Sequence, residues 1–258
     1  MMEGEFNSML EIYKLVPSFV PKPHAWGKFT RPTPLTHFFL CDFLEITNDM
    51  PDPVQLCSRV AELHRTSVSP TGKFGFHVKN CHGKIPQATD WDSSWSSYFT
   101  KLITGFFQIE ISINGPWPEY ETAFQQLVNH VIPQLLEPLQ SDGRNLKPCL
   151  VHGDLWEENT ATDLETGEPI VFDSSAMYAH NEYELGMWRR EIIRIGRPYF
   201  KQYLRNFPPS EPVEQWDDRN RLYSVKVQPR SHDWLARFAF GERAVCLSIR
   251  TTIQNTMS

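Results

Sequence analysis

The sequence predicts an α+β fold in which short extended segments alternate with longer amphipathic helices. Two observations carry this prediction. Several segments repeat apolar residues at the three-to-four-residue spacing of helices, and a few short apolar runs end in polar turn residues, as strands do. With 258 residues, 40% of them hydrophobic, the chain can bury a substantial core and lies near the size at which a domain divides into lobes. We therefore expect one lobed domain or two.

The N-terminal part is predicted to contain one helix and one strand. Residues 3–15 have the spacing of an amphipathic helix, whose apolar face is formed by Phe6, Met9, Leu10 and Tyr13. The proline-rich segment VPSFVPKPHAWG ends this helix. Residues 36–46, THFFLCDFLEI, are rich in strand-forming side chains and predict a buried strand that leads into a loop.

Asp52 marks the start of the next helix. Aspartate caps helix N-termini, Pro53 suits the first helical position, and Gln55 stands at the position of a capping box. The apolar face continues through Leu56, Val60 and Leu63. Residues 70–98 contain too many Gly, Pro and Asp residues for one regular element, so we expect a packed loop there.

Three more helices are predicted in the second half of the chain. Residues 118–139 repeat apolar positions every three to four residues, and Pro133 is expected to kink that helix. Residues 181–196 and 197–207 have the pattern of two further helices, the second opened by Pro198. The tail after residue 226 does not continue the helical pattern, so we expect that a final helix is missing there.

Composition narrows the class of protein. A formal charge of −6 argues against a nucleic-acid-binding protein, because phosphate backbones attract clustered Lys and Arg. The five cysteines are widely spaced and contain no C-x-x-C pair, which favours a reducing compartment over a disulfide framework or a zinc site. The acidic N-terminus does not resemble a signal peptide, and no apolar run approaches the roughly 20 residues of a membrane helix. We expect a cytoplasmic protein that does not span a membrane.

Residues 151–173, VHGDLWEENTATDLETGEPIVFD, concentrate the polar residues that carry chemistry. KPCLVHGD and GEPIVFD have the pattern of short strands, and LETGE that of the turn that joins the second to an extended NTATD. If Thr166 is the centre of this hairpin, Asn159 lies opposite Asp173, with Asp154 just upstream. Three oxygen-bearing side chains are therefore predicted to converge.

The spacing D-x-x-x-x-N, followed 14 residues later by an aspartate at the end of a strand, is that of a phosphotransferase loop. In such a loop Asp154 would take or orient the proton of an acceptor hydroxyl, while Asn159 and Asp173 would hold Mg²⁺ against ATP phosphates. The competing interpretation is that all three are turn residues. His152 is either a structural histidine that bonds the loop backbone or a base, and Trp156 is either core or a wall of the acceptor site.

Several segments together resemble the fructosamine kinase family, in the aminoglycoside phosphotransferase and choline kinase branch of protein-kinase-like folds. The resemblance runs from about residue 3 to residue 226 and rests on LVHGDLWEEN, VFDSSAMYAHNEYEL, GKFGFHVKNCHGKIPQATDWDSSW and the N-terminal segment. H-G-D-x-x-x-x-N alone indicates only the branch, whereas F-G-F-H, I-P-Q, W-x-x-x-W and Y-x-x-x-E-x-E-L are more specific. The resemblance implies ATP-dependent phosphorylation of the sugar 3-hydroxyl of ketosamines, and hence removal of glycation from proteins or small amines.

The resemblance also implies roles for individual residues. Asp154 corresponds to the catalytic base, and Asn159 and Asp173 to the magnesium ligands. Glu5 corresponds to the helix glutamate that pairs with a strand lysine, although without the family a solvated surface acid is the default interpretation.

Two further groups of residues follow from the resemblance. The hinge whose backbone contacts adenine falls on Leu40, Cys41, Asp42 and Phe43. The segment beside the acceptor site contains His180, Glu182 and Glu184, with Trp156 as a further substrate contact. A salt-bridged helix N-terminus is an equal alternative for Glu182 and Glu184.

The chain departs from the family pattern in its N-terminal part. It begins after the place of the phosphate-covering loop and the strand lysine, and it contains no G-x-G-x-x-G. We therefore expect residues 1–46 to be the remnant of a nucleotide-binding lobe with its hinge, and residues 47–258 to form a mainly helical catalytic and acceptor lobe. Ser174 also replaces the proline that usually follows the metal-binding aspartate.

Three function classes are compatible with these residues. The leading one is an ATP- and Mg²⁺-dependent ketosamine 3-kinase. The second is a kinase-like binding protein without turnover, because the phosphate-gripping loop and lysine are lacking. The third, a metal-dependent hydrolase that uses His152, Asp154 and Asp173, is weaker because such sites recruit more His and carboxylate ligands. The oligomeric state does not follow from the sequence.

Overall fold

The computed structural model describes residues 1–30, 36–47, 49–190 and 193–225. The α-helices are α1 (Met2–Leu15), α2 (Pro53–Thr66), α3 (Trp95–Asn114), α4 (Pro118–Gln126), α5 (Ile132–Leu136), α6 (Arg197–Asn206) and α7 (Trp216–Ser224). The 3-10 helices are η1 (Pro17–Phe19), η3 (Glu137–Gln140), η4 (Glu157–Asn159), η5 (Asn181–Arg189) and η6 (Val213–Gln215), and η2 (Leu127–Val131) is π-helical. The strands are β1 (Pro23–Lys28), β2 (His37–Cys41), β3 (Ile46–Thr47), β4 (Cys81–His82), β5 (Ile85–Pro86), β6 (Cys149–Val151), β7 (Thr160–Asp163), β8 (Pro169–Val171) and β9 (Met177–Ala179).

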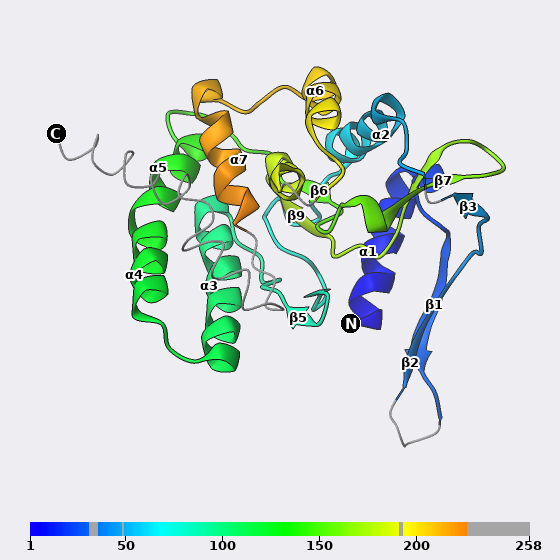
Figure 1. Ribbon diagram of the computed structural model, residues 1–258, viewed down its shortest axis with the longest axis horizontal. Coiled ribbons are helices and arrows are strands. Elements are labelled where there is room, and N and C mark those ends of the chain that lie inside the picture. The colour runs from blue at the N-terminus through cyan, green and yellow to red at the C-terminus, as the bar shows by residue number, and fades with distance from the viewer. Residues whose placement is uncertain (31–35, 48, 191–192, 226–258) are drawn as a thin grey trace.

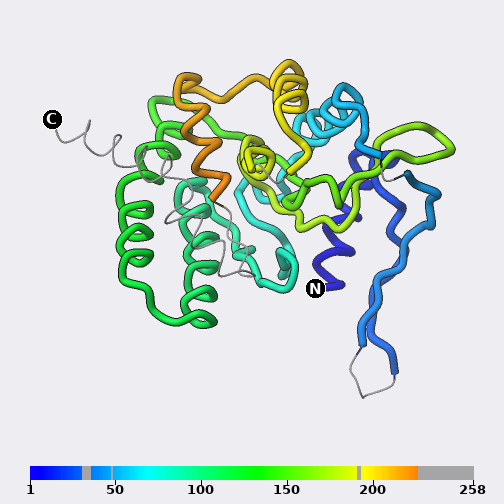
Figure 2. Tube along the Cα trace, in the orientation of Figure 1, coloured from blue at the N-terminus to red at the C-terminus, as the bar shows by residue number. Residues whose placement is uncertain are grey.

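The helices lie in two groups on either side of the short central strands. α3, α4 and α7 lie together on one side, and α2 packs against α6 on the other (Figure 1). The hairpin of β1 and β2 starts beside α1 and projects away from the body, which the tube in Figure 2 shows most clearly. The short strands near β6 therefore lie between the two helical groups. Among them, β6 ends at residue 151, and β7 and β8 lie within residues 151–173, the segment in which the sequence concentrates its chemically active polar residues.

The described strands form four small antiparallel sheets. β1 pairs with β2, β4 with β5 and β6 with β9, while β7 lies between β3 and β8. The single buried strand predicted over residues 36–46 is wrong in its length and its burial: it divides into β2 and β3, and neither strand contains a buried residue. β3 thus connects the end of the projecting hairpin to the sheet of β3, β7 and β8. Asn159 directly precedes β7 and Asp173 follows β8.

The first two predicted helices are confirmed. Of the predicted apolar face of α1, Met9 is buried whereas Phe6, Leu10 and Tyr13 are half-buried, and the inner face also buries Ile12, which was not predicted. Asp52 caps α2 through its carboxylate, which accepts hydrogen bonds from the backbone N–H groups of Val54 at 2.9 Å and Gln55 at 3.0 Å. Because the cap satisfies two N–H groups that have no partner within the helix, α2 begins where the sequence predicts.

The predicted helix over residues 118–139 is interrupted before its proline. α4 passes into the π-helical turn η2 and then into α5, where Pro133 stands in the first turn. Proline cannot donate the backbone hydrogen bond to the carbonyl four residues earlier, and the wider turn just before it absorbs that irregularity. The expected kink is therefore a π-helical bulge.

Two elements differ from the predictions. The loop expected over residues 70–98 ends at Ser94, whose hydroxyl caps α3 by accepting from the Ser97 N–H at 3.2 Å, so α3 was not predicted. Residues 181–189 form the 3-10 helix η5 instead of part of an α-helix over 181–196. Every residue from 181 to 188 is buried, so this segment has no solvent-exposed face and is fixed by contacts on all sides.

The core is centred on an aromatic cluster between α3, η5 and α7. Trp95 is fully buried, and the rings of Tyr98, Phe99, Tyr183 and Tyr223 lie within about 6 Å of its ring centre. Among the residues that the structure describes, no helix is both long and apolar enough to cross a membrane. The expectation for the tail after residue 226 falls on residues outside the described part.

Candidate active site

The loop after β6 carries His152, Gly153 and Asp154, and one buried carboxylate holds it. Glu184, from η5, accepts hydrogen bonds from the backbone N–H groups of His152 and Gly153, the latter at 3.0 Å. Gly153 has a φ of +82°, and a Cβ there would collide with the carbonyl oxygen of Ser175. Only glycine allows this approach in the left-handed region, so the H-G-D order is a backbone requirement.

The charge on Glu184 suits this task. Its carboxylate lies 3.5 Å from the Nε2 atom of His64, whose Nδ1 atom is bonded to the Tyr203 hydroxyl at 2.7 Å. Burial raises the pKa of Glu184, but the hydrogen bond and charge of His64, together with the backbone N–H of His152, outweigh it, so the pKa lies below its ordinary value. Glu184 therefore stays ionised and accepts both loop hydrogen bonds.

His152 joins this loop to the end of β8. Its Nε2 atom lies 3.0 Å from the Phe172 carbonyl oxygen, and its Nδ1 atom faces the Asp154 N–H at 3.3 Å. A carbonyl can only accept and an N–H can only donate, so the ring is neutral with its proton on Nε2. The structure thus favours the structural role over that of a base, and both ring nitrogens are directed at backbone groups instead of a metal.

Asn159 lies beside Asp154 but not opposite Asp173. Its Nδ2 atom donates to the Asp154 carbonyl oxygen at 2.8 Å, which directs the amide oxygen away from that bond. The Phe172 N–H donates to the Asn159 carbonyl oxygen at 3.2 Å, so the residue opposite Asn159 is Phe172 and the predicted register is wrong by one residue.

The turn between β7 and β8 explains the register. The Asp163 carboxylate accepts from the N–H groups of Glu165 at 2.9 Å and Thr166 at 2.7 Å, and Gly167 takes a φ of +72°. This aspartate turn is centred between Glu165 and Thr166, half a residue before the expected centre, which shifts the facing position by one.

Asp173 ends the extended segment with an unusual backbone. Its φ is +56°, in the left-handed region that non-glycine residues rarely occupy, although aspartate tolerates it better than most. The next residue, Ser174, donates its hydroxyl to the His152 carbonyl oxygen at 2.9 Å. The departure from strand geometry turns the chain at Asp173, while Ser174 fixes the turned segment to the loop that carries Asp154.

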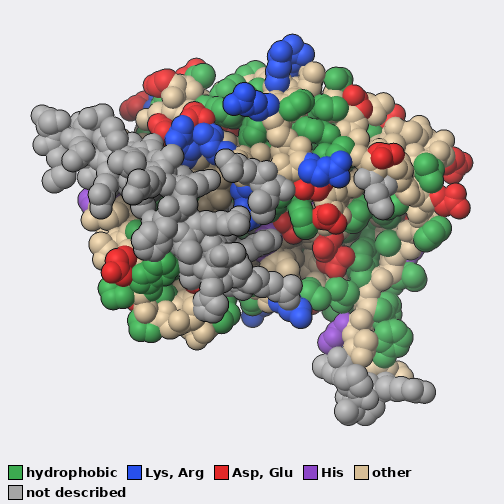
Figure 3. Space-filling view, in the orientation of Figure 1, with side chains coloured by type: hydrophobic (Ala, Val, Ile, Leu, Met, Phe, Trp, Pro, Cys, Tyr) green, Lys and Arg blue, Asp and Glu red, His purple; other side chains and the backbone are tan. Residues whose placement is uncertain are grey.

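Glu5 faces the same region from α1. Burial and, after it, the negative charge of Asp173 raise the pKa of its carboxyl to about 7 against the opposing effect of the N-terminal amino group. Within the described residues, no ion pair involves Glu5 or Asp173. The two carboxyl groups, predicted separately to serve the nucleotide, therefore lie close enough to repel each other. Figure 3 shows Asp and Glu side chains gathered on the face beside the base of the projecting hairpin.

The raised pKa of Glu5 predicts a pH-dependent stability. Because folding raises the pKa of Glu5 from 4.5 to about 7, mainly through burial, its favourable contribution to stability is complete below pH 4.5 and is lost as the pH rises through 7. Replacing Glu5 with glutamine should therefore stabilise the metal-free protein increasingly as the pH rises over that interval. Thermal unfolding in EDTA at several pH values measures the difference. The exposed Glu3→Gln is the control, and parallel curves for Glu5→Gln and the native chain would contradict the raised pKa of Glu5.

One hydroxyl connects α1 to the segment after Asp173. Ser8 accepts from the Ala176 N–H at 3.0 Å and from the Asn80 side-chain amide at 2.8 Å, and donates to the Gly4 carbonyl oxygen at 2.8 Å. A side chain at Gly4 would collide with Asn80, so α1 also lies directly against the segment before β4. These contacts fix Glu5 relative to Asp173.

The residues predicted as the hinge lie at the end of β2. The Asp42 N–H donates to the Lys22 carbonyl oxygen at 3.0 Å, and its carboxylate lies 2.6 Å from the His24 Nε2 atom. Burial, then the charges of Glu5 and Asp42, raise the pKa of the Cys41 thiol. Cys41 therefore faces Glu5, whereas the side chain of Phe43 is 89% exposed.

His180 and Glu182 do not have the surroundings of substrate contacts. The Arg219 guanidinium donates to both Glu182 carboxylate oxygens, at 2.8 and 3.0 Å, and both side chains are buried. The ring of His180 is bonded to the hydroxyls of Tyr223 at 2.8 Å and Ser210 at 2.9 Å, and burial lowers its pKa to about 4.

The structure thus gives this pair an internal role, because both side chains use their bonding groups within the core. It corrects the substrate assignment that the resemblance implies for them. Trp156 is half-buried, packs against the core and precedes η4 near Asp154 in the sequence. Its assignment as a wall of the acceptor site stays a prediction.

His82 was not predicted from the sequence, yet it lies beside Asp154 in the structure. Its Nδ1 atom lies 3.5 Å from the Oδ1 atom of Asp154. The residue stands within the family-like segment GKFGFHVKNCHGKIPQ, but nothing in its spacing links it to a residue 72 positions later. In the described part of the chain, no group of three His, Cys, Asp or Glu residues could hold a metal ion.

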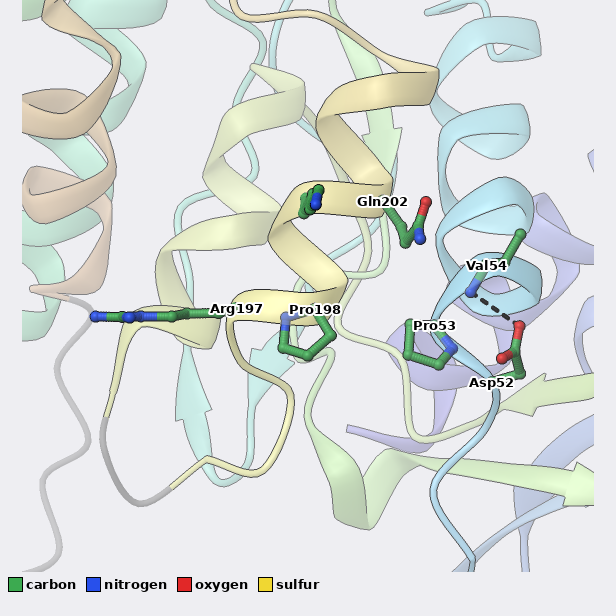
Figure 4. A pocket seen from close by; sticks show the side chains of 7 residues that line it. Asp52, Pro53, Val54, Arg197, Pro198 and Gln202 are labelled. Carbon is green, nitrogen blue, oxygen red and sulfur yellow. Dashed lines mark hydrogen bonds between the residues drawn. The ribbon is translucent and has the colours of Figure 1, made fainter.

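A surface groove of about 460 Å³ lies elsewhere, between the N-terminal ends of α2 and α6. Figure 4 shows it lined by Asp52, Pro53 and Val54 on one side and by Arg197, Pro198 and Gln202 on the other. Lys201 also lines it. None of the predicted site residues lines it. The chemistry of the loop after β6 is therefore separate from this groove.

Comparison with known proteins identifies the family. The family model described as fructosamine kinase matches residues 1–228. The chain belongs to the fructosamine kinase family. Among its curated relatives, a chloroplastic protein-ribulosamine 3-kinase of Oryza sativa subsp. indica is 31% identical over 226 residues, which cover 86% of this chain and 61% of that protein. The chloroplastic protein-ribulosamine 3-kinase of Arabidopsis thaliana is 29% identical, over 86% of this chain and 64% of that protein.

The solved structures agree on the fold of this fructosamine kinase family member. A candidate fructosamine-3-kinase from Haemophilus somnus 129PT superimposes with a TM-score of 0.66 at 19% identity, covering 87% of this chain and 69% of that one. This confirms the predicted α+β, protein-kinase-like fold. The chain spans about three fifths of the length of the curated plant relatives that it matches.

Proposed function

We propose that this protein phosphorylates the sugar 3-hydroxyl of ketosamines, with ATP as phosphoryl donor and Mg²⁺ as metal. Ribulosamine and fructosamine adducts on protein lysines or small amines are the proposed acceptors, and the product is a phosphorylated adduct on the route to deglycation. Family membership supports the reaction class. The observation that supports the proposal is that hydrogen bonds of His152, Asn159 and Ser174 join the segments that carry Asp154, Asn159 and Asp173.

The donor set of Asn159 and Asp173 suits Mg²⁺. The amide nitrogen of Asn159 donates to the Asp154 carbonyl oxygen, so the amide oxygen is the atom available as a ligand, and Asp173 supplies a carboxylate. Hard oxygen ligands of this kind are what Mg²⁺ prefers, and the bound ion would offset negative charge on the phosphates. Its positive charge would also relieve the repulsion between Asp173 and Glu5.

Asp154 acts on the acceptor. Its backbone is fixed at both ends, since its N–H faces His152 and its carbonyl accepts from Asn159. Its side chain would meet the acceptor hydroxyl, orient it and take its proton as the phosphoryl group is transferred. Because phosphoryl transfer depends mainly on positioning and charge, a loop held by Glu184 and His152 is an appropriate support.

We further propose that residues 1–46 form the nucleotide side and residues 47–258 the acceptor side, with Cys41, Asp42 and Phe43 beside the adenine. The four described cysteines are all free thiols, which supports a reducing compartment such as the cytoplasm. A second candidate function is a kinase-like protein that binds ketosamines with little turnover. The observation in its favour is the uncompensated pair of Glu5 and Asp173, since within the described residues neither carboxylate is ion-paired with a lysine or arginine.

The test is ADP release with a ribulosamine as acceptor, measured on residues 1–258 with Mg²⁺ and again with EDTA. We expect metal-dependent turnover, lowered more by Asp173→Ala than by Asn159→Ala, because a carboxylate is the stronger ligand and also neutralises charge. The unglycated amine is the control acceptor.

Calorimetry with the ribulosamine separates the two candidates. Binding without ADP release supports the second function and contradicts the first, whereas neither binding nor release contradicts both. A larger effect of Asn159→Ala than of Asp173→Ala would reverse the ligand assignment.

A further inference from the structure

The hairpin of β4 and β5 is anchored to the segment that follows Asp173. The Gln87 side-chain amide donates to the Ser175 carbonyl oxygen at 3.1 Å and to its hydroxyl at 3.0 Å. The Ser175 hydroxyl in turn donates to the Cys81 carbonyl oxygen at 2.8 Å, and Asn80 donates to the Ala176 carbonyl oxygen at 3.1 Å. Bonds at both ends of the hairpin therefore fix it against the site.

His82 is held between these anchors and faces the catalytic loop. Its side chain is 2% exposed, and its Nδ1 atom lies 3.5 Å from the Oδ1 atom of Asp154. The Asp154 Oδ1 atom is sealed from solvent, although the side chain as a whole keeps 13% of its exposure. The two carboxylate oxygens thus differ: Oδ1 faces His82, and the accessible side of the group is that of Oδ2.

We propose that His82 is a positioning residue for Asp154, which selects Oδ2 as the oxygen that meets the acceptor hydroxyl. This inference rests on the proposed kinase function. An N–H at Nδ1 needs only a small rotation of the carboxylate to form a hydrogen bond with Oδ1, and contacts of this kind commonly tighten when substrate binds. Without His82 the carboxylate can rotate about its terminal torsion, which has broad preferences, and present either oxygen or neither.

Three substitutions of His82 separate positioning from packing. In His82→Asn the amide nitrogen takes the place of Nδ1, whereas in His82→Gln the amide reaches the place of Nε2, and His82→Leu removes both. We expect Leu and Gln to lower kcat for ketosamine phosphorylation about tenfold or more, because small misplacements of a catalytic group are costly. Asn should restore most of the rate, and KM for both substrates should change little. His77→Leu, an exposed histidine of the same segment, is the matched control.

The His82 variants are compared with Asp154→Asn, assayed in parallel with thermal unfolding of each variant. If Asp154→Asn abolishes turnover and all three His82 variants keep the native kcat, only the positioning role is overturned. If kcat falls as far in His82→Asn as in His82→Leu and His82→Gln, the proposed geometry, in which Nδ1 orients the Oδ1 atom of Asp154, is overturned. If the native chain releases no ADP with any ketosamine, the proposed function fails and the positioning role with it. Should His82→Leu not fold, the comparison between Asn and Gln, both polar, still decides.

Discussion

Replacing Asp154 with asparagine should abolish phosphoryl transfer and leave the fold intact. The substitution preserves the volume of the side chain and both backbone bonds of the residue, to His152 and Asn159. It removes the carboxylate that orients the acceptor hydroxyl and takes its proton. The expected loss in turnover is at least ~10²-fold, the lower end of what general-base catalysis contributes.

The measurement is ADP release with a ribulosamine, with thermal unfolding as the check on folding. Glu158→Gln, an exposed acid four residues along the same loop, is the control and should keep the native rate. Turnover by Asp154→Asn equal to that of the native chain would remove Asp154 from its role. Loss of rate together with a large loss of stability would instead show that the carboxylate supports the loop.

Replacing Arg219 with methionine should destabilise the protein strongly. The guanidinium is fully buried and bonds both oxygens of Glu182, together with the carbonyl oxygens of Ser210 and Pro212. Removing it leaves an uncompensated buried carboxylate, which typically costs about 3–5 kcal/mol. For a chain of this size that corresponds to a fall of roughly 6–20 °C in the unfolding temperature.

Arg189 provides the matched control. Its ion pair with Asp217 is half exposed, so Arg189→Met should cost no more than about 1 kcal/mol. The double substitution of Arg219 by Met and Glu182 by Leu should recover part of the loss, because it removes the unpaired charge. Equal stabilities for Arg219→Met and Arg189→Met would show that the buried pair contributes little.

Local chemistry made much of the fold predictable. The cap at Asp52 and the apolar face of α1 depend only on neighbouring residues, and both helices begin within a residue of the expected positions. The kinase-like loop could be found because its spacing reflects a requirement of phosphoryl transfer. In contrast, the facing residue of Asn159 depended on how Asp163 folds its own turn, which spacing alone does not specify.

Other features depend on contacts that are distant in sequence. α3 escaped prediction because its start at Trp95 lies in an aromatic and polar stretch whose role becomes clear only when rings from η5 and α7 surround it. The burial of His180 and Glu182 follows from Tyr223 and Arg219, about 40 residues further on. His82 meets Asp154 only because the β4–β5 hairpin is anchored to the segment after Asp173.

The hydroxyl of Ser8 has a mechanical consequence. Its three hydrogen bonds join α1, the segment before β4 and the segment after Asp173 at one atom. Gly4 lies so close to Asn80 that no side chain fits between them. A swing of α1 away from the body would have to break the bonds to Asn80 and Ala176 at once, because the third bond lies within α1. The helix that carries Glu5 is therefore held rigidly beside the candidate site, and regulation of this protein by displacement of that helix would cost both hydrogen bonds.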